Sequence, residues 1–540
     1  MWALVQNRRI ERLVTHEIEP EQTTVSSIDT PDTTQHSPRK QKSEKKKKRG
    51  NESAKCILAA DSHGWIWVET SGEDDPLDPR NWTLLSRSKN IGILVFLIFT
   101  QGWAGSADSP ANERSSREFG VSQTAQNLST AMYLFGIGSG ALFAGPLSES
   151  IGRNPTYLVP TFIYLLFVLG SALSPTFAGQ VICRYFVGLC SSPTLSINGS
   201  SVGDQFRPVK RTFVFPAIAW ANIAGPMISP IVGGWISSNP SLSWRLTEYI
   251  TLIISACAWI VSFFFLPESY LPILLDWKSR QLRRQTGKAN YVSAQSRSSF
   301  LQRLKHAVPL PVILLTTEPV ISVLGAYLIL LYCILFTFLS GFDYIFKKTY
   351  NLSTGQTGSC FGAVAVGATI ATFATPGLYV WARRKTNYEH GATVTPEFRL
   401  WPAIIASPFL PISLFWLGWT NYPTVSIWSG LIACGIFGAV LISIYISSYE
   451  YIIDSYGKHA ASALASITMA RYLVAGGMVM AARPMYEGIG VHWTMTILGG
   501  LSVLLTPGPL LFRIYGARLR DRSRYADKLS QSEPEPDYPH

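Results

Sequence analysis

Charged side chains are scarce in this sequence. Asp, Glu, Lys and Arg make up 15% of its 540 residues, while hydrophobic residues make up 47%. Soluble domains carry about 25% charged residues, so the chain has too little charge to cover a soluble surface of its size. The charges also gather near the two ends and between residues 268 and 310. We therefore expect a membrane protein whose apolar segments lie between these charged stretches.

Features of enzymes and metal sites are missing too. The seven cysteines include no CxxC pair and no Cys/His metal spacing. The histidines lie in tails, loops or the ends of apolar runs, and no glycine-rich phosphate loop is followed by the required Lys. We expect no enzyme activity, no metal and no cofactor, so any transport must be driven by an ion gradient.

The N-terminal segment lacks the apolar core of a cleavable signal peptide. Residues 1–87 are polar and basic, and the run RKQKSEKKKKRG at 39–50 contributes to the net charge of +12. We expect 1–87 to be a disordered cytoplasmic tail that either lies near anionic lipid or is simply solvated. We expect no nucleic-acid partner.

About twelve apolar runs are long enough to cross a bilayer as helices. The polar insert at 268–316, expected as a cytoplasmic central loop, separates an N-terminal half (88–267) from a C-terminal half (317–514), and a cytoplasmic tail follows at 515–540. The expected spans are 88–108, 125–146, 156–175, 179–202, 212–236, 246–267, 317–341, 357–381, 398–419, 423–447, 459–482 and 492–514. The sequence therefore predicts an all-α membrane protein built from two equal halves.

Lys and Arg in the connections predict the orientation, because cytoplasmic connections carry an excess of them. The basic connections alternate with less basic ones when the N-terminus is placed inside. We expect a monomeric, multi-pass plasma-membrane protein in the lipid bilayer with both termini in the cytoplasm. The basic connections are those with Arg153, with Arg207, Lys210 and Arg211, with 278–305, with Arg383, Arg384 and Lys385, and with 513–528.

Ionisable residues within the apolar runs carry the most information, because such residues are costly in hydrocarbon and usually face a cavity or a partner. Arg184 lies within the fourth expected span without an acidic neighbour on its own helix, and Arg471 lies within the eleventh. Glu450 and Asp454 lie near the cytoplasmic end of the tenth. We expect their pairing to change with proton or substrate occupancy; for Glu450 and Asp454, snorkelling toward the interface is the alternative.

Aromatic and polar side chains along the central spans suit a cavity for amphipathic organic molecules, although Trp and Tyr at span ends often anchor the interface. Asp108 either attracts cations in the outer half of this cavity or lies at the outer water boundary. Asn351, in an outward NLS sequence, is a candidate glycosylation site, although its closeness to the membrane argues against modification. The candidate cavity residues are Asn127, Tyr133, Asn222, Tyr332, Tyr445, Tyr449 and Arg471.

Several motifs together resemble the major facilitator superfamily. GPLSESIGRNP (145–155) is similar to its cytoplasmic motif after the second helix, RYFVG (184–188) to its fourth-helix motif, and AGPMISPIVGG (224–234) to the fifth-helix motif of its antiporters. The match narrows to the fungal drug:proton antiporter branch, with multidrug and polyamine-type exporters, and runs from about residue 72 to about 525. The motifs that narrow it are DPLDPRNW (75–82), PESYLPILLDWKSRQLRRQTG (267–287) and YEYIIDSYGKHAASALA (449–465).

The resemblance implies the major facilitator fold, with about twelve transmembrane helices in two pseudo-symmetric six-helix halves. It also implies an alternating-access exporter in which protons drive the expulsion of amphipathic organic compounds: drugs, toxins or the cell's own secondary metabolites. Within that family, the arginine at the position of Arg184 acts in proton coupling. The fifth-helix motif shapes the interface between the halves, here through Gly225, Pro226, Pro230, Gly233 and Gly234.

The resemblance further implies a conformational latch at the cytoplasmic motif. Glu149 is expected to face the start of the eleventh span near residues 460–462, and Arg153 to reach Asp204, in one access state only. The latch residues are Gly145, Glu149, Gly152, Arg153 and Asp204. The sequence departs from the family pattern in both motifs. Ser229 replaces a glycine of the fifth-helix motif, which is expected to stiffen or reshape that crossing. In the cytoplasmic motif, Glu149 replaces an Asp, and Ser150 and Asn154 replace basic residues, so we expect a weaker electrostatic latch than in the general pattern.

Two other functions compete with export. A proton-coupled uptake permease for a small metabolite can use the same fold, since fold fixes neither direction nor substrate. A membrane receptor or sensor would bind its ligand without flux, and the number of spans and the two-half layout argue against it.

The latch can be tested with Glu149→Gln and Arg153→Ala. Both substitutions remove contacts that form in only one access state, so we expect slower turnover with normal membrane insertion. Export should be measured at matched protein abundance. Wild-type export by both variants would rule out the latch.

Overall fold

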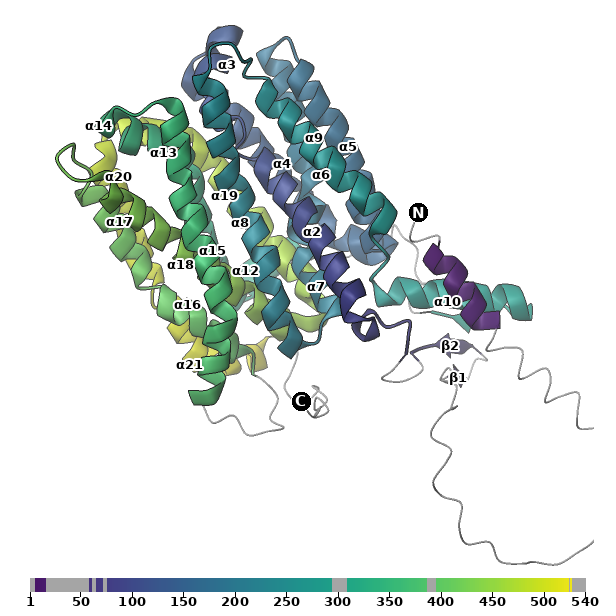
Figure 1. Cartoon of the computed structure of the whole chain (residues 1–540). Coiled ribbons are helices and arrows are strands. Elements are labelled where there is room, and N and C mark those ends of the chain that lie inside the picture. Colours follow the sequence, from purple (N-terminus) through teal and green to yellow (C-terminus); the bar gives the residue numbers. More distant parts are fainter. Residues whose placement is uncertain are drawn as a thin grey trace, which may run out of the picture.

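The computed structural model describes residues 5–15, 58–60, 65–70, 75–293, 308–385, 395–523 and 525–526. Most of these residues lie in long helices that run side by side in two groups (Figure 1). One group, blue to teal, comes from the N-terminal half, and the other, green to yellow, from the C-terminal half. The fold is therefore a two-part helical bundle, as the sequence predicts.

The N-terminal half begins at the short 3-10 turn η1 (Pro79–Asn81) and ends with α9. A second 3-10 turn, η2 (Ser109–Ala111), follows the first long helix. The helices are α2 (Leu84–Ala104), α3 (Asn112–Phe119), α4 (Gln123–Ile151), α5 (Arg153–Leu173), α6 (Phe177–Ser196), α7 (Asn198–Gln205), α8 (Pro208–Ser238) and α9 (Leu246–Phe265).

The C-terminal half contains three short turns, the π-helical η4 (Asp343–Lys347) and the 3-10 turns η5 (Pro396–Leu400) and η6 (Gly457–His459). Its helices are α12 (Leu310–Thr317), α13 (Pro319–Phe342), α14 (Lys348–Tyr350), α15 (Thr354–Lys385), α16 (Trp401–Ala406), α17 (Phe409–Trp419), α18 (Ile427–Tyr456), α19 (Ala460–Gly488), α20 (Gly490–Leu505) and α21 (Gly508–Arg522).

Within the described residues, 11 helical segments are long and apolar enough to cross a membrane. Helix α6 is not among them although it has 20 residues, since Arg184 and many small polar residues lower its apolar content. It packs against α4 and α5 inside the N-terminal half. With α6, the structure reaches the expected number of about twelve spans.

Three expected spans are interrupted in the structure. The fourth divides at Ile197 between α6 and α7, and the twelfth divides between α20 and α21 just before Gly508. The ninth, expected as one helix over 398–419, consists of η5, α16 and α17. Pro402 and Pro408 lie at its two joints, where the missing N–H groups favour a new helix start over a continued one.

The two halves meet along two helix pairs, α4 with α19 and α8 with α15. Small residues let these backbones approach each other. A Cβ atom on Gly476 of α19 would lie 3.2 Å from the carbonyl oxygen of Ala131 in α4. One on Gly358 of α15 would lie 2.5 Å from the carbonyl oxygen of Pro230 in α8. Both helix pairs can therefore pack this closely only because these two glycines have no side chain.

A small cluster outside the bundle joins the N-terminus to the central segment. Residues 5–15 form a helix beside α10 (Leu271–Thr286), at the same end of the bundle as the C-terminus (Figure 1). Strand β2 (Ile66–Val68) pairs antiparallel with β1 (Leu58–Ala60) and parallel with β3 (Tyr291–Val292). The buried apolar side chains of this N-terminal cluster are Ile10, Val14, Val68, Leu77, Leu274, Leu282 and Tyr291.

The side chain of Gln6 ties this helix to the end of the N-terminal half. Its Nε2 donates to the carbonyl oxygen of Glu268 at 3.0 Å, and its Oε1 accepts from the Glu268 backbone N–H, also at 3.0 Å. The amide therefore satisfies both backbone groups of one residue, as a neighbouring strand would.

The N-terminal cluster differs from the expectation that 1–87 is disordered. Ile10, Leu13 and Val14 recur at helical spacing, and this apolar stripe covers an apolar face of α10. The expectation overlooked a short amphipathic pattern because basic residues surround it. The polybasic run at 39–50 lies outside the described residues.

The substitution Val14→Asp tests the N-terminal cluster, because it places a carboxylate among apolar side chains. We expect amide hydrogen exchange in residues 5–15 and 271–286 to accelerate by about tenfold or more. Arg12→Asp, at an exposed position of the same helix, is the matched control and should leave exchange nearly unchanged. Equal exchange in Val14→Asp and the wild type would show that the helix does not depend on this contact.

Candidate functional site

Arg184 is paired with two carboxylates inside the N-terminal half. Its Nη2 lies 2.6 Å from Oε1 of Glu248, in α9, and it also forms an ion pair with Asp108, next to η2. Its Nη1 donates to the carbonyl oxygen of Ala104 at 2.8 Å, at the end of α2. The side chains of Arg184 and Glu248 are 3% and 1% exposed, and that of Asp108 is 9% exposed. We call Asp108, Arg184 and Glu248 the Arg184 triad.

Neighbouring hydroxyl groups hold the two carboxylates of the triad. Ser171 of α5 donates to Glu248 Oε1 at 2.8 Å, and Ser129 of α4 lies 3.5 Å from Asp108 Oδ2. The triad therefore links five structural elements, namely α2 with η2, α4, α5, α6 and α9. A single positive charge therefore serves two carboxylates here.

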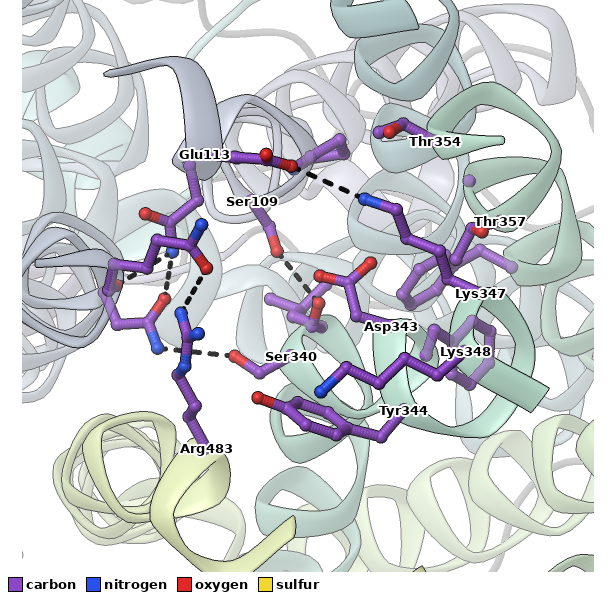
Figure 2. A pocket seen from close by; sticks show the side chains of 18 residues that line it. Ser109, Glu113, Ser340, Asp343, Tyr344, Lys347, Lys348, Thr354, Thr357 and Arg483 are labelled. Atoms are coloured by element: carbon purple, nitrogen blue, oxygen red, sulfur yellow. Dashed lines mark hydrogen bonds and ion pairs between the residues drawn. The ribbon is translucent and has the colours of Figure 1, made fainter. Parts of the chain in front are cut away.

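A pocket of about 260 Å³ (Figure 2) lies at the end of the bundle that carries α3 and α14, away from α10 and α21 (Figure 1). Its lining comes from both halves, from η2, α3 and α4 on one side and from α13, η4, α14, α15 and α19 on the other. The charged lining residues are Glu113, Asp343, Lys347, Lys348 and Arg483. We call this the outer pocket, in line with the predicted orientation.

Polar contacts between the halves surround the outer pocket. Lys347 Nζ lies 3.5 Å from Glu113 Oε2, and Ser109 Oγ donates to the carbonyl oxygen of Leu339 at 3.1 Å (Figure 2). Asn127, a predicted cavity residue, lines this pocket and lies 3.4 Å from Ser340 Oγ. Because Ser109 directly follows Asp108, the pocket reaches the neighbourhood of the Arg184 triad.

The predicted antiporter motif lies where α8 touches both halves. A Cβ atom on Gly225 would lie 2.5 Å from the carbonyl oxygen of Phe99 in α2, and one on Gly234 would lie 2.9 Å from that of Thr354 in α15. On the same helix, Gly233 faces Ala107, and Pro226 faces Gly102. Helix α8 therefore passes between α2 and the C-terminal half with no room for side chains at these points.

Ser229, the departure within this motif, has a defined partner. Its Oγ lies 2.7 Å from Oγ of Ser106, which donates to the carbonyl oxygen of Pro226, also at 2.7 Å. Two hydroxyl groups thus fill the crossing of α8 with the chain after α2. Ser229 therefore adds a side-chain hydrogen bond between α8 and the chain that follows α2.

The turn that contains Gly152, between α4 and α5, is built around Glu268. Gly152 adopts φ 100°, a conformation that favours glycine, and any side chain there would collide with the Glu268 carboxylate. That carboxylate accepts from the backbone N–H of Arg153 at 2.9 Å and of Asn154 at 3.1 Å, which caps the start of α5. Burial raises the pKa of the Glu268 carboxyl, and these hydrogen bonds oppose the rise.

The structure brings most of the predicted latch residues together. Arg153 Nε lies 2.8 Å from Oδ2 of Asp204, at the inner end of α7. Gly145 faces the backbone of Ala461 at the start of α19, where a Cβ atom would lie 3.7 Å away. Glu149 lies one helical turn beyond Gly145 and is half-buried. Whether these contacts act as a latch stays a prediction.

A second group of ion pairs joins the halves near the end of the bundle opposite the outer pocket. Asp454 of α18 pairs with Arg211 of α8, and its Oδ2 lies 2.8 Å from Arg399 Nε in η5. Arg399 also lies 3.3 Å from Glu450, and its Nη2 donates to the carbonyl oxygen of Pro208 at 2.7 Å. Helix α18 extends beyond the expected end at 447, and the side chains of Glu450 and Asp454 are 0% and 10% exposed in these ion pairs, so they do not snorkel. The ion pairs of Asp454 connect α8 of one half to α18 and η5 of the other.

Arg471 lies near the middle of α19 inside a ring of tyrosines. Its guanidinium carbon is 4.3 Å from the ring centre of Tyr332, in α13, and 5.2 Å and 5.5 Å from those of Tyr445 and Tyr449, in α18. Tyr472 completes the ring at 4.9 Å. We call Arg471 and these four tyrosines the Arg471 cage. Four of the predicted cavity residues therefore lie together.

The remaining predicted residues lie apart from the cage. Tyr133 donates to the carbonyl oxygen of Gln101 at 2.5 Å, and Asn222 donates to that of Ile218 at 3.1 Å, both within the N-terminal half. Asn351 is exposed at the end of α14 with φ 54°, and its glycosylation stays a prediction. No group of three or more metal-binding side chains occurs among the residues that the structure describes.

Sequence reasoning missed Glu248, Glu268 and Arg399. Glu248 is the third residue of α9, where the sequence suggests a charge at the membrane interface. However, a Glu at the start of an apolar run was a candidate partner for Arg184, for which the sequence offered no partner on its own helix. Glu268 stood in the quoted motif PESY without an assigned role. Arg399 lies at the start of the ninth expected span. Only its separation along the chain from Arg383, Arg384 and Lys385 distinguishes it from the basic residues of the preceding connection.

Comparison with known proteins identifies relatives over most of the chain. A sequence model of the Major Facilitator Superfamily matches residues 94–480. The chain is 40% identical over 462 residues to the MFS-type transporter kojT of Aspergillus flavus, covering 85% of this chain and 82% of the relative. It is 32% identical over 465 residues to the citrinin biosynthesis cluster MFS transporter mrr1 of Monascus ruber, covering 85% and 92%.

Solved structures share the fold at low sequence identity. The proton:xylose symporter XylE aligns with a TM-score of 0.58 at 15% identity, covering 80% of this chain and 97% of the symporter. The human organic anion transporter MFSD10 aligns with a TM-score of 0.53 at 16% identity, covering 78% and 98%. These similarities establish the arrangement of the helices and nothing about the cargo.

The substitution Asp454→Ala tests the cytoplasmic ion pairs. It leaves Arg211 and Arg399 without their shared carboxylate, and breaking a buried pair costs about 3–5 kcal/mol. We expect a clearly lower midpoint of thermal unfolding for the purified protein. Glu118→Ala is the control, because it breaks a pair with Arg245 in which the Glu118 side chain is 46% exposed, worth about 0.2–1 kcal/mol. Equal midpoints for the two variants would contradict the importance of Asp454.

Proposed function

Because the chain belongs to the major facilitator superfamily, we propose that this multi-pass membrane transporter is a proton-coupled exporter of small organic compounds. The proposed cargo includes drugs, toxins and the cell's own secondary metabolites. The Arg184 triad is the observation that carries the proposal, because it supplies a buried group able to hold one proton.

Charge balance explains why the triad suits proton coupling. With both carboxylates ionised, one arginine leaves the site with one excess negative charge in an environment that stabilises charge poorly. One added proton makes the site neutral. Proton binding and release therefore change the cost of burying the triad, and a transporter can use this difference to favour one access state over the other.

Protons can reach the triad from the outer pocket. Asp108 directly precedes Ser109 and Pro110, which line that pocket, while Glu248 lies deeper and is almost fully buried. We assign Asp108 as the carboxylate that exchanges protons with the outside. The guanidinium of Arg184 then shifts between the two carboxylates, so a change in the charge of Asp108 also alters the ion pair with Glu248.

The contacts of α2 and α8 support a mechanical link from the triad to the C-terminal half. Arg184 binds the last carbonyl group of α2, and α2 packs against Gly225 of α8. Helix α8 in turn touches α15 at Gly234 and Gly358. Among the described contacts, α8 is the only helix that packs against both α2 and α15. A change of charge in the Arg184 triad can therefore act through α2 on α8, and through α8 on the C-terminal half.

The direction and cargo are supported by sequence similarity. The motif of Gly225 to Gly234 resembles that of antiporters, which favours export driven by inward protons. A relative named for a citrinin biosynthesis cluster supports a secondary metabolite as cargo. We further propose a monomer in the plasma membrane with both termini in the cytoplasm, where the N-terminal cluster and the C-terminus lie at one end of the bundle.

The experiment uses the full chain in an efflux-deficient yeast and in proteoliposomes, with a panel of antifungals, polyamines and fungal metabolites. We expect at least one compound to be exported uphill and a protonophore to abolish this export. Glu248→Gln and Asp108→Asn should reduce uphill export by about tenfold or more and preserve exchange of the compound across a membrane without a gradient.

Two further measurements complete this test. Glu118→Gln, a carboxylate paired at the surface, should export as well as the wild type. Uphill accumulation inside the cell would favour an uptake permease, and binding without flux would favour a sensor. Full proton-driven export by both triad variants would overturn the role of the triad.

A further inference from the structure

Arg471 is a fully buried arginine without a hydrogen-bond acceptor among the described residues. Its relative exposure is 0%, and none of its three nitrogen atoms has a hydrogen-bond partner. The hydroxyl groups of Tyr332 and Tyr445, on the two neighbouring helices, have no partner either. Three groups that can donate hydrogen bonds therefore meet at one place without an acceptor.

The other buried arginines of the bundle are paired differently. Arg184 contacts two carboxylates, Arg399 contacts two, and Arg153 contacts one. For Arg471 no ion pair is found in the part of the chain that the structure describes, and only tyrosine rings surround its charge. Ring faces stabilise a cation in part, but they accept none of its five N–H groups in the way a carboxylate does.

The position of the Arg471 cage suits a cargo site. Arg471 lies near the middle of α19 and about 18 Å along the helix from Arg483 of the outer pocket, at the helical rise per residue. Tyr449 of the cage stacks on Phe215 of α8, with ring centres 6.0 Å apart, so the cage meets the N-terminal half. Transporters of this kind bind cargo near the midplane between their halves, and separation of α8 from α18 would open this region.

We propose that the Arg471 cage binds the anionic form of an aromatic organic acid. The guanidinium would hold the carboxylate through two parallel N–H bonds, the hydroxyls of Tyr332 and Tyr445 would donate to the same oxygens, and the tyrosine rings would pack against the ring of the cargo. This inference rests on the proposed export function and narrows its cargo to anions.

The test compares acids with their neutral amides on the purified full chain in nanodiscs. The probes are benzoate, cinnamate and 2-naphthoate, each paired with its carboxamide of nearly equal shape. We expect at least one acid to bind about tenfold or more tightly than its amide. Arg471→Gln should remove this preference, and Tyr445→Phe, which keeps the ring, should weaken it.

Arg513→Gln is the matched control, since it removes an arginine that stacks on an aromatic ring outside the cage, that of Trp401 at 3.7 Å. It should leave the preference for the acid intact, whereas loss of the preference in Arg513→Gln but not in Arg471→Gln would overturn the proposal. Equal binding of every acid and its amide by the wild type, or binding of neither, would also overturn it, and this result does not depend on any variant folding.

Transport separates this inference from the proposed function. If neutral compounds are exported with dependence on protons and Glu248 while acids are not preferred, the cage proposal fails and the exporter stands. If acids bind with dependence on Arg471 but no compound moves against its gradient, the exporter fails and the binding site stands.

Discussion

The cost of placing a guanidinium in hydrocarbon organises this protein. A buried arginine is costly without acceptors, and where carboxylates and carbonyl groups supply them, these partners determine which helices are held together. Arg184 binds α2, η2 and α9 to α6, while Arg399 binds α8 and α18 to the start of the ninth span. The first set lies within one half and the second crosses between the halves. In the proposed mechanism, pairs of the first kind hold a proton, and pairs of the second kind break when this end of the bundle opens.

Glu268 has a comparable role at the cytoplasmic surface without a direct arginine partner. Its carboxylate caps α5, its backbone binds Gln6, and its neighbour Tyr270 lies under the guanidinium of Arg153 at 4.7 Å. One residue thus joins the turn after α4, the start of the central segment and the N-terminal helix. These contacts connect the turn at Gly152 to the N-terminal cluster.

The sequence predicts the bundle well and the site only in part. Apolar runs of sufficient length reveal the spans, and proline explains the breaks that simple length counting overlooked, as at Pro408. Arg184 and Arg471 stand out because charge is rare in such runs. Their partners do not, since Glu248 lies 64 residues from Arg184 and no local pattern records that pairing. The short N-terminal helix was missed because Ile10 and Val14 form a pattern too brief to recognise without its partner α10.

The contact between Gln6 and Glu268 has a consequence for biosynthesis. The two residues are separated by 262 positions, and translation proceeds at about 5–20 residues per second, so roughly 13 to 50 s pass between their synthesis. All spans of the N-terminal half are synthesised within this interval. The helix at 5–15 is therefore made before its partner Glu268 and can form this contact only after the chain of the whole half exists.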